Sequence, residues 1–221
     1  MKAMTRIIRY SAFLLMISFL LVFTACNGTP SGSETQTQAA TAAESKADAT
    51  GQASEKSAAK SETGSGKTLV VYFSATGTTK GVAEKIASAV KADTYEILAA
   101  QPYTTDDLNW HDSNSRTTKE QNDKSVRPKI GSDKLSLDDY ATVFIGYPIW
   151  WGEEPRIMDT FVESYDFNGK TVIPFCTSGG SGIGSSGTNL AANAGGGNWL
   201  EGERLSSSSD IDGWIKGLNL Q

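Results

Sequence analysis

The pattern of hydrophobic and polar positions divides the chain into three parts. After a start that carries basic but no acidic residues, residues 12–23 are apolar except for Ser18. Residues 27–66 contain no aromatic residue and no Leu, Ile or Val. Residues 67–221 alternate β-rich apolar runs with segments in which apolar residues recur at helical spacing. We therefore expect one folded domain over residues 67–221.

Stretches rich in β-branched and aromatic residues predict four strands and a short fifth, and the apolar runs at 68–73 and 142–147 are typical of strands buried on both faces. They lie at 68–73, 94–98, 142–147, 171–176 and near 198–201. Apolar residues three and four positions apart predict helices between and after these strands. The clearest helical stripes are Val82, Ile86 and Val90, then Met158, Phe161, Val162 and Tyr165 after Pro155, and finally Ile211, Trp214, Ile215 and Leu218. Weaker helices are expected around 115–124 and 186–194.

Strands separated by helical segments predict an α/β domain, with a parallel five-stranded sheet and helices on both of its faces. In such sheets ligands bind outside the carboxyl ends of the strands, where the strand order reverses. The candidate chemistry is therefore expected in the loops after the first, third and fourth strands. The polar segment 99–137, which contains Trp110 and His111, is the least readable part of the domain.

The loop after the first strand, residues 74–79, carries four hydroxyl side chains immediately before a helix. Hydroxyl groups and the free N–H groups of a helix N-terminus can bind a phosphate without any lysine. Neither the Walker pattern nor the G-x-G-x-x-G pattern of dinucleotide-binding proteins is present. A helix cap rich in Ser and Thr is the alternative interpretation.

The loops after the third and fourth strands are also unusual. Trp150 and Trp151 are adjacent at the end of a strand, where neighbouring side chains point to opposite sides. One indole can then pack toward the core while the other presents a flat face to a planar ligand. The loop over 177–184 is rich in glycine, which permits close approach of the backbone to a ligand. The alternatives are two indoles that only cover the core, and a glycine loop that is only flexible.

Three sequence motifs together resemble the flavodoxin-like family. They are V-V-Y-F-S-A-T-G-T-T at 70–79, G-Y-P-I-W-W-G at 146–152 and P-F-C-T-S-G-G-S-G-I-G at 174–184. The resemblance covers residues 67–221 and implies strand order 2-1-3-4-5, with FMN bound where that order reverses. The uncommon acidic pair Glu153-Glu154 stands next to the implied flavin site.

The resemblance also implies a role for each loop. The FMN phosphate is expected on Ser74, Thr76, Gly77, Thr78 and Thr79. The isoalloxazine ring is expected to be flanked on one side by Pro148, Ile149, Trp150, Trp151 and Gly152, with Trp150 the preferred stacking partner. Its other side and its pyrimidine edge are expected to be lined by Thr177, Ser178, Gly179, Gly180 and Gly182.

Charge and composition exclude several other classes of protein. The formal net charge is −5, and because the first 26 residues hold three basic and no acidic residues, the remainder carries −8. An acidic body of this kind argues against nucleic acid as a partner. One histidine and two cysteines are too few for a zinc site or an iron–sulfur cluster. No pairing of a nucleophile with a base is visible, so no catalytic residue is assigned.

The N-terminus has the organisation of an export signal. A basic start, a short apolar stretch and small residues before Cys26 are typical of a secretory signal over residues 1–25. The position of Cys26 resembles the lipidation site of bacterial lipoproteins; an ordinary signal peptide with a chance cysteine is the alternative. Residues 26–66 would then be an anchor and tether that hold the domain on the extracytoplasmic face of the membrane.

Three hypotheses for function follow. The first is an FMN-binding electron-transfer protein or small oxidoreductase, which would exchange electrons with redox partner proteins or small acceptors. The second is an NAD(P)H-dependent quinone or flavin reductase, with a substrate pocket built in part from 99–137. The third is a non-redox module that binds another phosphorylated or planar ligand.

Overall fold

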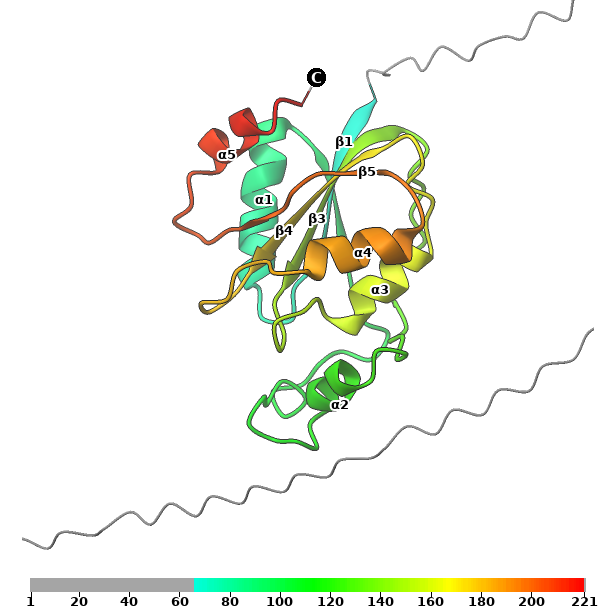
Figure 1. Ribbon diagram of the computed structural model, residues 1–221, viewed down its shortest axis with the longest axis vertical. Coiled ribbons are helices and arrows are strands. Elements are labelled where there is room, and N and C mark those ends of the chain that lie inside the picture. The colour runs from blue at the N-terminus through cyan, green and yellow to red at the C-terminus, as the bar shows by residue number, and fades with distance from the viewer. Residues whose placement is uncertain (1–65, 221) are drawn as a thin grey trace, which may run out of the picture. The chain divides into compact units, whose positions relative to one another are not determined.

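The computed structural model describes residues 66–220 (Figure 1). The proposed signal sequence, Cys26 and the tether lie outside these described residues. The elements in chain order are β1 Lys67–Phe73, α1 Thr78–Val90, β2 Asp93–Ile97, α2 Arg116–Asn122, β3 Tyr140–Pro148, α3 Arg156–Glu163, β4 Thr171–Thr177, α4 Ser186–Ala194, β5 Asn198–Trp199, β6 Glu203–Arg204 and α5 Ile211–Gly217. Among residues 66–220, no helix is both long enough and apolar enough to cross a membrane.

The strands form one sheet in the order β2-β1-β3-β4-β5, and every ladder in it is parallel. This confirms the predicted order and fold class. The sequence predicted one short fifth strand, whereas the structure has two short segments at this position, β5 and β6, and both pair with β4. Pro174 lies between the two pairing regions and has no N–H to donate, so the ladder is interrupted there.

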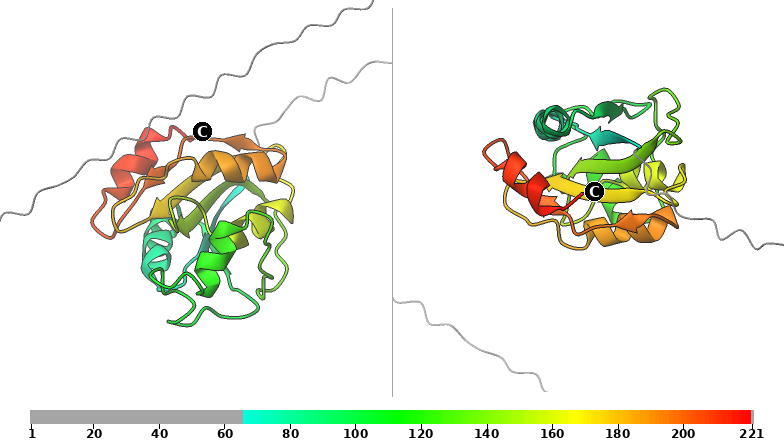
Figure 2. Two further views of the ribbon diagram at one scale, coloured as in Figure 1. Left: turned by 60° about the horizontal axis from the view of Figure 1, so that its bottom comes forward. Right: turned by 90° about the horizontal axis from the view of Figure 1, so that it is seen from above.

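The helices cover both faces of the sheet, as predicted (Figure 2). On one face α1 and α5 pack over strand residues such as Val70, Phe144 and Phe175. On the other face α3 and α4 pack over alternate strand residues such as Val71 and Ile145. Successive side chains of a strand point to opposite faces of the sheet, and since helices cover both faces, the strand side chains on each face are buried.

Helix α2 stands apart from these two layers. It lies beyond the carboxyl ends of the strands, on the side where β1 and β3 end (Figure 1). Its N-cap is Ser115, whose side chain accepts a hydrogen bond from the Thr118 N–H. The 99–137 segment, which was hard to interpret from the sequence, therefore contains an ordered helix near the expected site.

Gly146 of β3 is required by the packing of the neighbouring strand. It lies opposite Phe175 of β4, and a Cβ atom at this position would overlap the Phe175 ring. Phe175 is fully buried and lies 6.5 Å, centroid to centroid, from the indole of Trp214 on α5. The ring has little room to move, so the absence of a side chain at Gly146 determines how closely the strand and helix layers pack.

We expect Gly146→Ala to destabilise the fold by about 1–3 kcal/mol, the usual cost of overpacking a well-packed core. Gly81→Ala is the matched control, because Gly81 lies within α1 and a Cβ atom added to it would meet nothing within 4 Å. That change is expected to stabilise the chain by about 0.5–1 kcal/mol through helix propensity. Urea unfolding of both variants gives the comparison, and equal stabilities would contradict this account of the core.

Candidate functional site

A cavity of about 550 Å³ lies at the carboxyl ends of β1, β3 and β4. The three loops singled out in the sequence meet there. Its lining residues are Ala75, Thr76, Thr78, Thr79, Leu108, Trp110, Thr117, Pro148, Ile149, Trp150, Trp151, Thr177, Ser178 and Gly179. The structure thus brings together ten of the fifteen predicted binding residues. Ser74, Gly77, Gly152, Gly180 and Gly182 belong to the same loops but do not line the cavity.

The loop after β1 ends at a helix N-terminus with unsatisfied donors. The N-cap of α1 is Gly77, which has a φ of 87° and no side chain that could cap the helix. The first turn of α1 contains no acidic residue. The Ser74 hydroxyl oxygen is buried and has no hydrogen-bond partner among the described residues. A helix start with free N–H groups and no nearby carboxylate favours an anionic ligand.

Two buried hydroxyl groups join this loop to the loop after β4. The Oγ1 atoms of Thr79 and Thr177 lie 2.8 Å apart and are hydrogen-bonded. The Ile149 N–H donates to the Thr177 carbonyl oxygen at 2.9 Å, which adds the third loop. Direct hydrogen bonds among cavity-lining residues therefore connect the three loops.

Residues 150–153 form a tight turn at the end of β3. Trp150 and Glu153 exchange backbone hydrogen bonds of 2.9 and 3.0 Å. The two residues between them, Trp151 and Gly152, have φ of 50° and 84°. Positive φ at both central positions is typical of a type I′ turn, and it is unfavourable for tryptophan. The turn therefore holds Trp151 in a conformation that the surrounding contacts must maintain.

The two adjacent indoles have different surroundings. Trp150 packs edge-to-face against Phe73 and Tyr103, with ring centroids 5.6 and 5.3 Å away. Trp151 is 45% exposed, although it also lines the cavity. One indole thus packs inward while the other remains accessible, as the sequence indicated. Trp150, the preferred stacking candidate, is the more enclosed of the two.

The glycines after β4 are surrounded by open space. No atom lies within 4 Å of the Cβ position at Gly179, Gly180 or Gly182. The protein's own packing therefore does not require glycine at these positions. The Ser178 hydroxyl donates to the Ser181 carbonyl oxygen and accepts a hydrogen bond of 3.3 Å from the Gly180 N–H, which closes the loop on itself. Of these glycines, Gly179 lines the cavity, where the lack of a side chain permits close approach of a ligand to the backbone.

A fourth wall of the cavity is formed by Leu108, Trp110 and Thr117. The reductase hypothesis placed a substrate pocket in part on 99–137, but none of these three residues was assigned to a site from the sequence. Trp110 is 67% exposed, and its ring lies 3.4 Å, centroid to centroid, from that of His111. The Thr117 hydroxyl donates to the Asp107 carbonyl oxygen at 2.6 Å and so fixes the start of α2 to the preceding loop. The one signal in the sequence was an isolated tryptophan in an otherwise polar segment.

Comparison with known proteins agrees with this geometry. The family model described as Flavodoxin matches residues 67–218. The chain belongs to the flavodoxin family. No curated protein matches it.

Three solved structures of bacterial proteins have similar chains. A protein of Bacteroides eggerthii described as a flavoprotein is 48% identical, with a TM-score of 0.67, and the match covers 71% of this chain and 99% of that one. A corresponding protein of Bacteroides uniformis is 50% identical, with a TM-score of 0.66 and coverage of 68% and 98%. A flavoprotein of Lactobacillus acidophilus, crystallised in complex with FMN, is 26% identical, with a TM-score of 0.55 and coverage of 68% and 99%.

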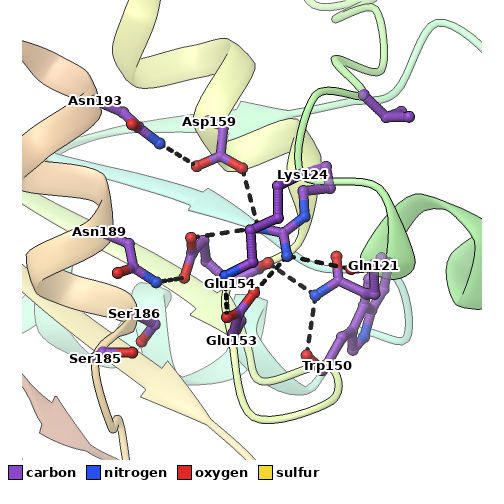
Figure 3. Close-up of polar contacts among 12 residues, drawn as sticks. Gln121, Lys124, Trp150, Glu153, Glu154, Asp159, Ser185, Ser186, Asn189 and Asn193 are labelled. Carbon is purple, nitrogen blue, oxygen red and sulfur yellow. Dashed lines mark hydrogen bonds and ion pairs between the residues drawn. The ribbon is translucent and has the colours of Figure 1, made fainter. Parts of the chain in front are cut away.

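In this member of the flavodoxin family, a buried ionic cluster lies directly behind the 150–153 turn (Figure 3). Arg156 is 3% exposed and its guanidinium contacts three carboxylates, those of Glu153, Glu154 and Asp159. Its Nη1 atom lies 3.5 Å from Glu154 and 3.4 Å from Asp159. Lys124 bonds to Glu153 at 2.8 Å. We define these five residues as the ionic cluster.

The carboxylates of the cluster have different proton affinities. The bond from Lys124, followed by that from Arg156, lowers the pKa of Glu153. Burial raises the pKa of Asp159, although an amide hydrogen bond from Asn193 partly opposes this effect. Burial also raises the pKa of Glu154, to about 7, and the charge of Asp159 adds to the increase. Since Glu154 is only 1% exposed, water screens its charge poorly.

We expect Glu154→Gln to increase stability at neutral and alkaline pH. The folded state binds a proton at Glu154 up to about pH 7, whereas the unfolded chain releases it near 4.5. Stability therefore falls as the pH rises between these values, and the variant avoids a loss of roughly 3 kcal/mol. Urea unfolding of both proteins between pH 4 and 8 measures the difference.

Glu163→Gln is the contrasting variant. A hydrogen bond from Arg127 lowers the pKa of Glu163, so its carboxylate stabilises the fold at pH values above its unfolded pKa. Its replacement should therefore reduce stability at neutral pH and have little effect in acid. Parallel pH profiles for the two variants would contradict the assignment of the proton to Glu154.

Proposed function

We propose that the chain binds FMN in this cavity and functions as an electron-transfer protein or small oxidoreductase. The observation that carries the proposal is the chemistry of the cavity walls. The lining combines hydroxyl groups at a helix N-terminus, two adjacent indoles and the start of the glycine loop, and none of its described residues carries a carboxylate. FMN has a matching anionic end and planar end, and the flavoprotein of Lactobacillus acidophilus was crystallised with FMN.

The residues present fit this cofactor. Thr76 and Thr78 have exposed side chains with Oγ1 atoms 3.4 Å apart, and both line the cavity. They would hold the phosphate together with the buried Ser74 hydroxyl, which lacks a partner among the described residues, and the N–H groups that begin α1. Trp151, Trp150 and the backbone of Gly179 would enclose the ring. FMN bound there would supply transfer of one or two electrons.

The protein would orient the flavin and control access to it. Trp110 and Trp151 are exposed at the cavity, so a redox partner protein or a small acceptor could approach from that side. The wall formed by Leu108, Trp110 and Thr117 favours a second candidate function, an NAD(P)H-dependent quinone or flavin reductase. NADH or NADPH oxidation by the loaded chain, with a quinone as acceptor, distinguishes the two.

We further propose that the domain acts outside the cytoplasm, held at the membrane by lipidated Cys26 and the tether over 26–66. The support is the basic and apolar start of the sequence and the small residues before the cysteine. Mass spectrometry of the chain from a membrane fraction tests this. Replacing Cys26 by serine should release the domain from the membrane.

The test of the cofactor is a visible absorption spectrum of the full chain, before and after addition of FMN and desalting. We expect retained flavin absorbance and quenched flavin fluorescence. A colourless chain that cannot be loaded would overturn the proposal and would favour a module that binds another phosphorylated or planar ligand.

The phosphate position is tested by Thr76→Ala and Thr78→Ala. Each replacement removes one hydroxyl that would bond to the phosphate, so FMN affinity should fall by about 1–3 kcal/mol per variant. Thr188→Ala on α4 is the control, because its hydroxyl donates only to the Ser185 carbonyl oxygen. Fluorescence titration with FMN measures the affinities, and unchanged values in both cavity variants would place the phosphate elsewhere.

A further inference from the structure

Glu154 belongs to the same structural unit as the turn that borders the cavity. The Gln121 side chain donates to the Trp150 carbonyl oxygen at 3.0 Å and to that of Glu154 at 3.1 Å (Figure 3). Glu154 follows Trp151 by three residues, so their Cα atoms are no more than about 11 Å apart. Trp151 in the turn thus lines the cavity, and Glu154, directly after the turn, carries a buried carboxyl group.

The charges around Glu154 do not balance when all the carboxyl groups are ionised. Arg156 interacts most closely with Glu153, so Glu154 and Asp159 share its other terminal nitrogen at 3.5 and 3.4 Å. Both of these carboxylates are 1% exposed. One buried guanidinium cannot neutralise three carboxylates, even though Lys124 also bonds to Glu153. A proton on one buried carboxyl group restores the balance.

The described elements packed around Glu154 provide no other cation in contact with it. Helix α4 presents the neutral side chain of Asn189, whose amide donates to Glu154 at 3.2 Å. Strand β3 presents Tyr147, whose hydroxyl is paired with Ser186. On α3, Asp159 receives a shorter bond of 2.9 Å from Asn193 and is further stabilised as an anion by the charge of Arg127. Glu154 is therefore the group in the cluster best suited to hold the proton.

We infer that Glu154 is a proton-binding site linked to the charge in the cavity: it binds a proton from solvent more tightly when the bound flavin is reduced and more weakly after reoxidation. This inference rests on the proposed function. The electrons come from an external donor, which is dithionite in the test. Two electrons entering the cavity with one proton from solvent leave one added negative charge there. A second proton from solvent forms an O–H bond with the Glu154 carboxylate, and the loss of that carboxylate's charge offsets the added charge.

The size of the linkage follows from distance. For a negative charge added roughly 10 Å from the Glu154 carboxyl group, which is close to the chain-length limit between the Cα atoms of Trp151 and Glu154, an effective dielectric constant of about 20 gives a rise in pKa of about one unit. Reduction should therefore increase the proton affinity of Glu154 about tenfold. By reciprocity, protonation of Glu154 favours reduction by the same factor. For a two-electron couple this corresponds to a shift of about 30 mV.

The test compares midpoint potentials of the FMN-loaded full chain and its Glu154→Gln variant between pH 5 and 10. At low pH both side chains are neutral and the two potentials should coincide. As the pH rises through 7, the wild-type carboxylate forms, and its potential should fall below that of the variant until the difference reaches its plateau. Glu201→Gln is the control: it makes the same change on an exposed loop and keeps Glu154, so its potential should follow that of the wild type at every pH.

A second variant tests the same site by another route. Asn189→Ala removes an amide that bonds to the ionised form of Glu154, so the pH of the transition should increase. This variant also keeps the inference testable if Glu154→Gln does not fold. An unchanged transition in Asn189→Ala would contradict the assignment.

The third measurement does not require bound FMN. The side-chain carboxyl ¹³C resonance of Glu154, assigned by its absence in Glu154→Gln, should titrate near pH 7 in the flavin-free chain. Titration at the usual value for glutamate would overturn this inference alone. A loaded chain whose potential follows that of the variant at every pH would also overturn it alone, whereas a chain that binds no FMN would overturn the proposed function as well.

Discussion

The parallel pairing of β1 with β3 is the constraint on which the site depends. The chain leaves β1 toward β2 on one side of it and later returns to β3 on its other side. The strand order reverses between β1 and β3, and the loops that follow them diverge to opposite faces. Because β3 and β4 are also parallel, with Pro148 opposite Thr177, the loop after β4 emerges at the same edge. A hydroxyl loop, an indole turn and a glycine loop therefore converge on one cavity, although they lie far apart in the sequence.

The sequence predicted those elements whose cause is local. Buried strands such as β1 and β3 appear as unbroken apolar runs, and α3 as a stripe over Met158, Phe161 and Val162 that the structure buries completely. The three loops could be assigned to a site because strand polarity alone places their ends together. The interruption between β5 and β6 was harder to foresee, because Pro174 exerts its effect on a neighbouring strand rather than on its own.

The parts that could not be predicted depend on contacts between distant residues. The wall formed by Leu108, Trp110 and Thr117 has no periodicity of its own and is held by capping and side chain-to-backbone hydrogen bonds. The acidic pair at 153–154 was visible, but its two members have opposite environments. Glu153 bonds to Lys124 at the surface, whereas Glu154 is enclosed between α3 and α4. Neither burial nor the identity of a partner many residues away can be read from the sequence, and these two quantities set the proton affinity.

The contacts of the ionic cluster account for the unfavourable backbone conformation of the 150–153 turn. A buried ion pair gives little net stability, because desolvation of its charges offsets their attraction. A tryptophan at positive φ costs of order 1–3 kcal/mol and persists only where its surroundings determine its conformation. Here Glu153 closes the turn through its backbone and binds Arg156 through its side chain, while Gln121 bonds to the carbonyl groups on both sides of the turn. The cluster therefore specifies the position of the Trp151 indole at the cavity, and the buried charge that this requires leaves Glu154 as the carboxyl group best suited to remain protonated.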